Sequence, residues 1–285
     1  MSAIAERAML VQLSMGGFSG KRMARDVARE VAESRGAESD SLDAVLRLIP
    51  PRELKGIEAA SRACRDYYCR RTLPWQRRGA SILPCKIYFD FTKRMGELLE
   101  ARRQEVDSFM TRYEESAVHW VTRLGGIAHG ETLPTADKVR ERFEANVQVW
   151  PFPSGNDFRL DMEEGQLAEL RKAADDAANV RVAEAVADAV NRLRVVVRRY
   201  VDNLGHTEDG RARRITGGME SDLRDLLDVL PAFNLTGSKE LDAIVEDAKS
   251  LLNAPAESLR EDEALRGQVR EDAQRIYEKM AAIWG

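Results

Sequence analysis

Residues 88–124 read YFDFTKRMGELLEARRQEVDSFMTRYEESAVHWVTRL, and this stretch sets the expectation for the fold. Apolar side chains recur there at spacings of three and four from Phe91 to Leu124, with one gap at Arg102. This pattern is typical of an amphipathic helix. At a rise of about 1.5 Å per residue, the helix is roughly 55 Å long. A helix of that length has to bury its apolar stripe against another surface.

A second long stripe lies in residues 163–204, where alanines dominate the first half and valines the second. Gly125 and Gly126 end the first helix. The residues between the two helices contain β-like runs at 147–150 and 158–162 around a Pro-Ser-Gly-Asn turn. We therefore predict a mainly α fold. A long antiparallel, coiled-coil-like helical hairpin spans residues 88–205 and carries a small β-hairpin insert at 125–162.

The flanking regions are predicted to contain shorter elements. Region 1–87 begins with a strand or helical turn at 9–14 and has an irregular segment at 72–84, because two prolines and a glycine interrupt it. Region 219–285 is predicted to be acidic and helical, after a glycine-containing linker. The shorter helices are expected at 21–34 with Ser19 as N-cap, at 41–49, 52–71 and 135–143, and in the last region at 219–230, 239–253 and 259–284.

Composition favours exposed helices over a compact enzyme core, because 32% of the residues are charged and only 6% are aromatic. The net charge of −4 excludes a general affinity for polyanions. Charge is nevertheless uneven along the chain. Residues 62–79 contain six arginines and one acid, whereas residues 220–279 contain 15 acids and 8 bases, so the two segments are expected to attract each other.

The three cysteines, Cys64, Cys69 and Cys85, form no disulfide framework and indicate a reducing compartment. No window has the roughly 18 to 20 apolar residues of a membrane span, and the N-terminus lacks the pattern of a signal peptide. We expect a cytoplasmic protein, in the host cytoplasm if a phage encodes it, without contact to a membrane. The cysteines and histidines lack the spacing of a zinc site, so no metal or cofactor is expected.

No catalytic set emerges from the sequence. The segment GGFSGKR at 16–22 departs from the phosphate-loop pattern, because Met15 stands at the first glycine position and Arg22 at the hydroxyl position. It is interpreted as a helix N-terminus. Adjacent acidic pairs such as Glu114 and Glu115 point to different faces of a helix and cannot share a proton. We therefore predict that the protein is not an enzyme.

The remaining candidate is an arginine-rich segment that also contains aromatic residues. Guanidinium groups next to rings are what single-stranded nucleic acids require, since the cations hold phosphates and the bases stack on the rings. The alternative is structural: the arginines pair with the acidic C-terminal region, and Trp75 anchors the core. The candidate anion or nucleic-acid patch comprises Arg62, Arg65, Arg70, Arg71, Trp75, Arg77 and Arg78.

Several blocks resemble a family of uncharacterised phage and bacterial proteins that is known only as a domain of unknown function. The blocks are LVQLSMGGFSGKRMARDVAREVA (10–32), TLPW (72–75), ILP (82–84), YFDF (88–91) and VWPFP…DFRLDM (149–162). The resemblance covers residues 5–204. It implies genes beside a MoxR/CobS-like AAA+ ATPase and a CobT-like von Willebrand A protein, and it supplies no catalytic residues.

Two functions remain open from the sequence. The first is a non-enzymatic helical scaffold or adaptor, which is phage-encoded if the resemblance holds and acts by self-assembly or by docking to partner proteins, including such an ATPase system. The second is a single-stranded nucleic-acid-binding protein in phage replication or recombination. The expected partners are thus other proteins or further copies of the chain, with nucleic acid as the alternative.

Overall fold

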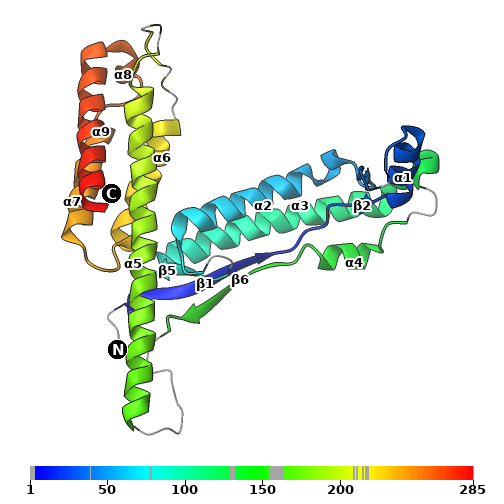
Figure 1. Ribbon diagram of the computed structural model, residues 1–285, viewed down its shortest axis with the longest axis horizontal. Coiled ribbons are helices and arrows are strands. Elements are labelled where there is room, and N and C mark those ends of the chain that lie inside the picture. The colour runs from blue at the N-terminus through cyan, green and yellow to red at the C-terminus, as the bar shows by residue number, and fades with distance from the viewer. Residues whose placement is uncertain are drawn as a thin grey trace. The chain divides into compact units, whose positions relative to one another are not determined.

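The computed structural model describes residues 4–38, 40–76, 79–128, 132–153, 164–207, 209, 211–213, 215 and 218–284. Over these residues the protein is mainly helical, with a four-strand antiparallel sheet and a small two-strand sheet (Figure 1). The chain forms two compact units. Unit 1 comprises residues 1–12, 69–91 and 149–285, and unit 2 comprises residues 13–68 and 92–148. Neither unit is a single consecutive stretch, and the predicted regions 1–87, 88–205 and 219–285 stay a prediction.

Unit 2 is built on two antiparallel helices, α2 and α3, which lie side by side in Figure 1. Glu53 on α2 pairs with Arg112 on α3 at 3.1 Å, while Ser61 further along α2 accepts a hydrogen bond from the earlier residue Arg102. The elements of this unit are β2 (Lys21–Met23), α1 (Arg25–Ser34), β3 (Val45–Arg47), most of α2 (Pro51–Arg71), most of α3 (Tyr88–Thr122), a 3-10 turn η2 (Gly125–Ala128) and α4 (Ala136–Glu141).

The apolar stripe of α3 forms the core of unit 2. Phe109 stacks on Trp120 at 6.1 Å between ring centroids and meets Phe143 edge-on at 5.7 Å. The Tyr113 hydroxyl donates a hydrogen bond to the carbonyl of Pro134 at 2.6 Å. The other buried members are Ile49, Leu54, Ile57, Val106, Met110 and Val139. Aromatic rings in edge-on and stacked contacts add to the stability from buried area, so this cluster fixes how α2, α3 and α4 pack.

Unit 1 is organised around α5, which packs against α6 and α9 (Figure 1). Its valine-rich second half contributes Val186, Leu193 and Tyr200 to the core, whereas Leu167 and Leu170 in the first half are only half-buried. The elements are β4 (Leu73–Pro74), β5 (Ser81–Pro84), a 3-10 turn η1 (Cys85–Ile87), α5 (Glu164–Asn203), α6 (Gly218–Phe233), α7 (Lys239–Lys249), a 3-10 turn η4 (Ser250–Asn253), α8 (Ser258–Glu261) and α9 (Glu263–Trp284).

The four-strand sheet has the order β4-β5-β1-β6, in which β1 (Ala8–Met15) and β6 (Ala145–Pro151) each have residues in both units. The register pairs Ala8 with Pro84 and Val11 with Ser81. Val11 and Leu83 lie on one face of the sheet and Ile82 on the other, and all three are fully buried, so both faces of the sheet are covered here. The opening run is thus a strand, and the described residues of the segment 72–84 are not helical, as the prolines predicted.

Both long helices are confirmed, but the predicted antiparallel hairpin between them is wrong. Helix α3 lies mostly in unit 2 and α5 lies in unit 1, and their stripes enter two separate hydrophobic clusters. The partner of α3 is α2, whose stripe is shorter and therefore less prominent in the sequence. The partners of α5 are the helices of the acidic C-terminal region, which belongs to the same compact unit.

Two short elements near the N-terminus also differ from the prediction. Residues 21–23 form strand β2 and residues 45–47 form strand β3, which pair antiparallel from Lys21↔Arg47 to Met23↔Val45. Helix α1 begins only at Arg25, and its buried residues are Ala28 and Ala32. The predicted helix at 41–49 is absent because its residues extend to complete this pairing.

The predicted insert is described in part. Helix α4 begins after Thr135, as expected, although the Thr135 side chain makes no capping hydrogen bond. The first β-like run forms β6, whose described partner is β1. The second run, 158–162, lies outside the described residues, so the β-hairpin stays a prediction.

Gly20 allows a tight turn before β2, and replacing it by alanine should destabilise unit 2. Its φ of 59° is left-handed, and an added Cβ would lie 2.6 Å from the buried Ile49 side chain. We expect a loss of about 2 kcal/mol or more, from backbone strain of about 1 kcal/mol plus overpacking. The matched control is Gly36→Ala, since Gly36 has a φ of 67° with nothing within 4 Å of the added Cβ. Equal losses in urea unfolding would contradict the proposed clash.

Candidate anion-binding site

A pocket of about 340 Å³ lies in unit 2, between helix α2 and the loop that follows β1. Its floor is apolar and its rim carries two guanidinium groups, those of Arg62 and Arg65. The other lining residues are Gly16, Gly17, Phe18, Ser19, Leu54, Ile57, Glu58, Ser61 and Phe143.

The loop is held against the segment that precedes β6. The Gly16 amide donates to the Glu144 carbonyl at 2.8 Å, and a side chain at Gly16 would collide with the Arg142 carbonyl. The Arg142 guanidinium carbon lies 5.1 Å from the ring centroid of Phe18. Phe18 is partly buried and packs against the core of the unit. These contacts fix the loop wall of the pocket. Arg62 and Arg65 form the other wall, because residues three apart share one face of a helix.

Arg102 lies directly behind the pocket with only 3% of its surface exposed. Its guanidinium donates to the Gly16 carbonyl at 2.8 Å, to the Phe143 carbonyl at 2.6 Å and to the Ser61 hydroxyl at 2.9 Å. All three acceptors belong to residues that line the pocket. No carboxylate of the described residues forms an ion pair with Arg102, so its hydrogen bonds are satisfied while its charge is not neutralised.

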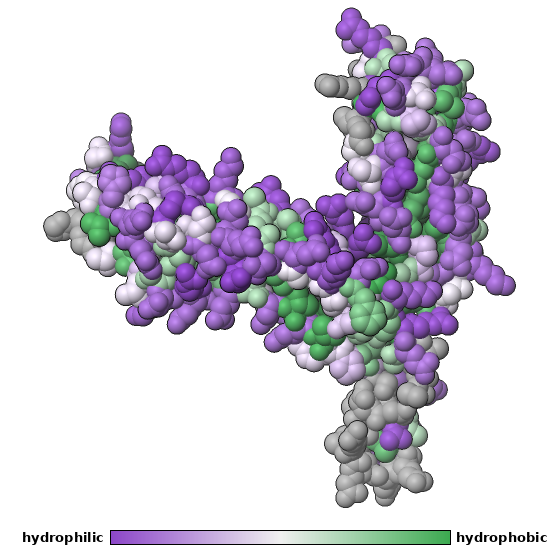
Figure 2. Space-filling model, turned by 180° about the vertical axis from the view of Figure 1, so that it is seen from behind, coloured by the Kyte–Doolittle hydropathy of each residue, from purple (hydrophilic) through white to green (hydrophobic). Residues whose placement is uncertain are grey.

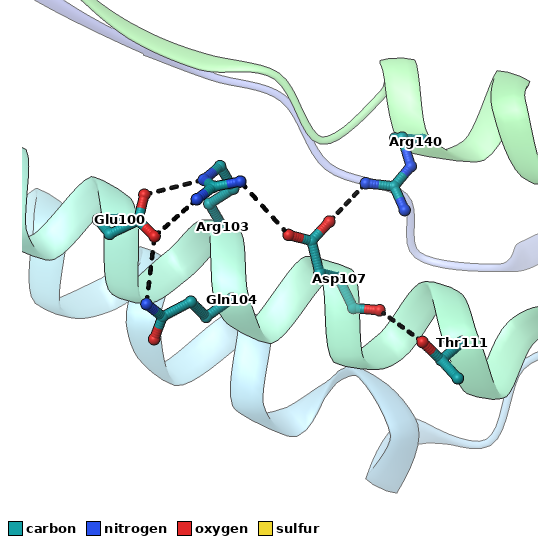
Figure 3. A network of polar contacts seen from close by, with 6 residues as sticks. All are labelled: Glu100, Arg103, Gln104, Asp107, Thr111 and Arg140. Atoms are coloured by element: carbon teal, nitrogen blue, oxygen red, sulfur yellow. Dashed lines mark hydrogen bonds and ion pairs between the residues drawn. The ribbon is translucent and has the colours of Figure 1, made fainter.

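Arg62 and Arg65 are exposed, and neither forms a hydrogen bond or an ion pair within the described part of the chain. Two other arginines of unit 2, Arg103 on α3 and Arg140 on α4, do form ion pairs. Arg103 contacts Glu100 at 2.7 Å and Asp107 at 3.6 Å. Arg140 on α4 pairs with the same Asp107 (Figure 3). Gln104 donates to Glu100 in the same network. Acids are therefore available in unit 2, but they neutralise other arginines.

The electrostatics of the pocket follow from this distribution. Burial lowers the pKa of Arg102, and the nearby positive charge of Arg65 lowers it further. Arg102 stays charged at neutral pH because a guanidinium does not deprotonate in proteins. The charged residues that line the pocket, Arg62, Arg65 and Glu58, give a net charge of +1, and Arg102 adds a further positive charge behind the wall. A cleft with low-dielectric walls focuses such a field, so the pocket attracts anions.

Cys64 lies on the buried side of α2 beside this cluster and is fully buried. Burial raises the pKa of its thiol, while the positive charge of Arg102 lowers it by a smaller amount. The thiol is therefore protonated at neutral pH and acts as a packing residue, because reactivity requires the thiolate.

The members of the sequence-predicted patch fall in both units, so the patch as a whole stays a prediction. Arg62 and Arg65 belong to unit 2, whereas Arg70, Arg71 and Trp75 belong to unit 1. Arg70 pairs with Asp225 at 3.2 Å, which is the predicted attraction between the basic segment and the acidic region. Trp75 is 9% exposed and meets Phe152 edge-on, so it offers no face for stacking. Arg77 and Arg78 lie outside the described residues.

A second pocket, of about 420 Å³, lies in unit 1 beside Arg70, but its cations are paired. Arg199 contacts Asp222 at 3.3 Å, and Arg192 contacts Asp188 at 2.7 Å. Arg192 also donates to the carbonyls of Cys69 and Thr72. These arginines therefore act in the structure of unit 1, and the field around this pocket is weaker than that around the first.

Two further classes of site are absent from the described residues. No group of three or more histidine, cysteine, aspartate or glutamate side chains there lies close enough to hold a metal ion. Among the described helices, none combines the length and the apolar character of a membrane span. Hydrophilic side chains cover most of the face shown in Figure 2.

The sequence missed the loop wall of the pocket and the role of Arg102. The sequence at 16–22 predicts a helix N-terminus, but the loop leads into strand β2. One signal for Arg102 was present: it is the charged residue that interrupts the apolar stripe of a long helix. A charge at a position that faces the core is buried only when it is well hydrogen-bonded, so the gap marks a polar site.

The comparisons give no relative from which a function can be taken. No family model matches the chain, and neither the curated proteins nor the solved structures contain a match. The resemblance of residues 5–204 to an uncharacterised family thus stays an expectation from its motifs.

Proposed function

We propose that this protein is a non-enzymatic adaptor that binds a partner protein through an anionic group held between Arg62 and Arg65. The observation that carries the proposal is the unneutralised cluster of Arg62, Arg65 and buried Arg102 around one pocket. Like charges held together destabilise the free protein, because Arg65 and Arg102 repel. An anion in the pocket removes this repulsion and forms charge-assisted hydrogen bonds to both exposed guanidinium groups.

A docking role also accounts for the rest of the architecture. Unit 1 and unit 2 each have their own hydrophobic cluster, so unit 1 offers a second body for self-assembly or for another partner. The family resemblance adds an AAA+ ATPase system as the first partner to test. These partners are part of the proposal and rest on the motifs quoted above.

Single-stranded nucleic acid is the second candidate, and exposed Arg62 and Arg65 are the observation in its favour. It has less support than a protein ligand, because stacking needs open aromatic faces and Trp75 is buried. Phe18 is packed on the core and covered by Arg142. We therefore treat nucleic-acid binding as an outcome of the test.

The test is affinity capture with three forms of the tagged full chain. These are the wild type, the pocket variant Arg62→Gln/Arg65→Gln, and the control Arg94→Gln/Arg103→Gln. The lysate comes from the cells in which the protein occurs and is treated with nuclease. The control removes two exposed, ion-paired arginines from the same unit. We expect one defined partner that the wild type and the control retain, that the pocket variant loses, and that binds again when purified and mixed with the wild type.

Two results would contradict the proposal. In the first, the pocket variant captures the same proteins as the wild type, which shows that the pocket is not used. In the second, capture depends entirely on nucleic acid and disappears with nuclease. Circular dichroism of each variant checks that its helix content matches that of the wild type. This control excludes unfolding as the cause of a loss of capture.

A further inference from the structure

We infer that the pocket of unit 2 binds a phosphate monoester, presented by a phosphorylated side chain of the partner protein. This inference rests on the proposed function and specifies its ligand. The residues that line the pocket carry a net charge of +1 from Arg62, Arg65 and Glu58, and buried Arg102 adds a second positive charge behind the wall. A phosphate monoester has a charge of about −1.5 to −2 near pH 7, whereas the carboxylate of an acidic side chain has only −1. Charge therefore favours the phosphate.

The donors on the rim also suit a phosphate group. Arg62 and Arg65 project from adjacent turns of one helix, so both can reach the oxygens of one anion. Guanidinium groups bind phosphate through parallel N–H donors, and clusters of arginine are a recurrent mode of phosphate recognition. Ser19 on the opposite wall adds a hydroxyl, whose oxygen accepts a hydrogen bond from the Lys21 amide at 3.3 Å and keeps its proton available to donate.

The rest of the pocket fits the carbon chain that carries the phosphate. Leu54, Ile57 and Phe143 are buried and form an apolar floor beneath the charged rim. A volume of about 340 Å³ admits a phosphorylated side chain with its neighbouring backbone. Arg102 cannot reach out to the ligand, since its hydrogen bonds hold it behind the wall, so it contributes its field and positions the loop.

Isothermal titration calorimetry on the full chain tests the inference with four probes. These are a phosphoserine peptide, the same peptide with glutamate at that position, inorganic phosphate, and a single-stranded oligonucleotide. We expect the phosphoserine peptide to bind at least ten-fold more tightly than the glutamate peptide. Inorganic phosphate should compete with it for the site. Arg62→Gln/Arg65→Gln should weaken the phosphopeptide at least ten-fold, while Arg94→Gln/Arg103→Gln should leave its affinity within about two-fold.

The outcomes separate this inference from the proposed function. Equal affinity for the glutamate and phosphoserine peptides would overturn phosphate specificity, and so would equal affinity of the pocket variant and the wild type. Tight binding of the oligonucleotide alone would assign the pocket to nucleic acid. If the pocket-dependent partner is captured from lysate but dephosphorylation leaves its binding unchanged, the adaptor function stands and the phosphate inference fails.

Discussion

Replacing Arg102 by methionine is expected to lower the free energy of unfolding of unit 2 and to leave that of unit 1 unchanged. The substitution keeps much of the apolar stem but removes the donors to the carbonyls of Gly16 and Phe143 and to the hydroxyl of Ser61. A buried carbonyl that loses its partner costs about 1 to 3 kcal/mol. Because two carbonyls are affected, we expect the free energy of unfolding of unit 2 to fall by about 3 kcal/mol.

Hydrogen exchange monitored by mass spectrometry is the suitable measurement, because a single melting midpoint does not separate two units. Amides of α3 and of the loop after β1 should exchange faster, and amides of α5 should not change. The control is Arg103→Met, which removes an exposed ion pair and should cost less than about 1 kcal/mol. Similar exchange in the two variants would show that Arg102 does not hold the loop and helices together.

Replacing Arg266 by methionine is expected to have an effect of similar size in unit 1. Arg266 is 6% exposed and donates to the carbonyls of Asn203, Leu204, Gly205 and Arg213. Three of these lie at the C-terminal end of α5, where the last carbonyls have no partner within the helix. The charge also interacts favourably with the negative end of the helix. We expect the substitution to lower the free energy of unfolding of unit 1 by about 3 kcal/mol.

The same exchange measurement locates this effect. Amides in the last turns of α5 and in α9 should lose protection, and those of α3 should retain it. Arg275→Met is the matched control on α9, since Arg275 is exposed and pairs with Asp272 three residues earlier. A loss confined to α9, with the end of α5 unchanged, would contradict a capping role for Arg266.

The long helices and their stripes were predictable because periodicity depends on local sequence. Their partners were not. Both α3 and α5 have stripes that fit many helical surfaces, and nothing in the stripe of α3 selects α2 over α5. The choice depends on specific contacts such as Arg102 with Ser61 and Glu53 with Arg112, which join residues 41 and 59 positions apart.

The strands β2 and β3 were missed for a related reason. The apolar residues in and around these strands recur at a helical spacing or show no periodicity, and each strand has only three residues. They are stabilised by pairing with each other over a sequence separation that local patterns do not encode. The turn at Gly20 was the available signal, because a left-handed glycine before Lys21 is incompatible with a helix that begins there.

The candidate site was predictable in its charged residues and not in its geometry. The arginine-rich segment contains Arg62 and Arg65, but sequence alone could not separate them from Arg70, which pairs with Asp225. Whether an arginine is neutralised depends on which acids the fold brings to it. The loop that completes the pocket lies more than 40 positions earlier in the chain, so its contribution could not be inferred from the segment itself.

Amide NMR of the full chain during titration with inorganic phosphate tests the central claim most directly, because it locates an anion on the protein without assuming a partner. We predict the largest shift changes at residues 16–19 and 61–65, saturable, and abolished in Arg62→Gln/Arg65→Gln. Changes that are absent, or that are largest around Arg70 and Arg199 in unit 1, would contradict an anion site in the pocket of unit 2.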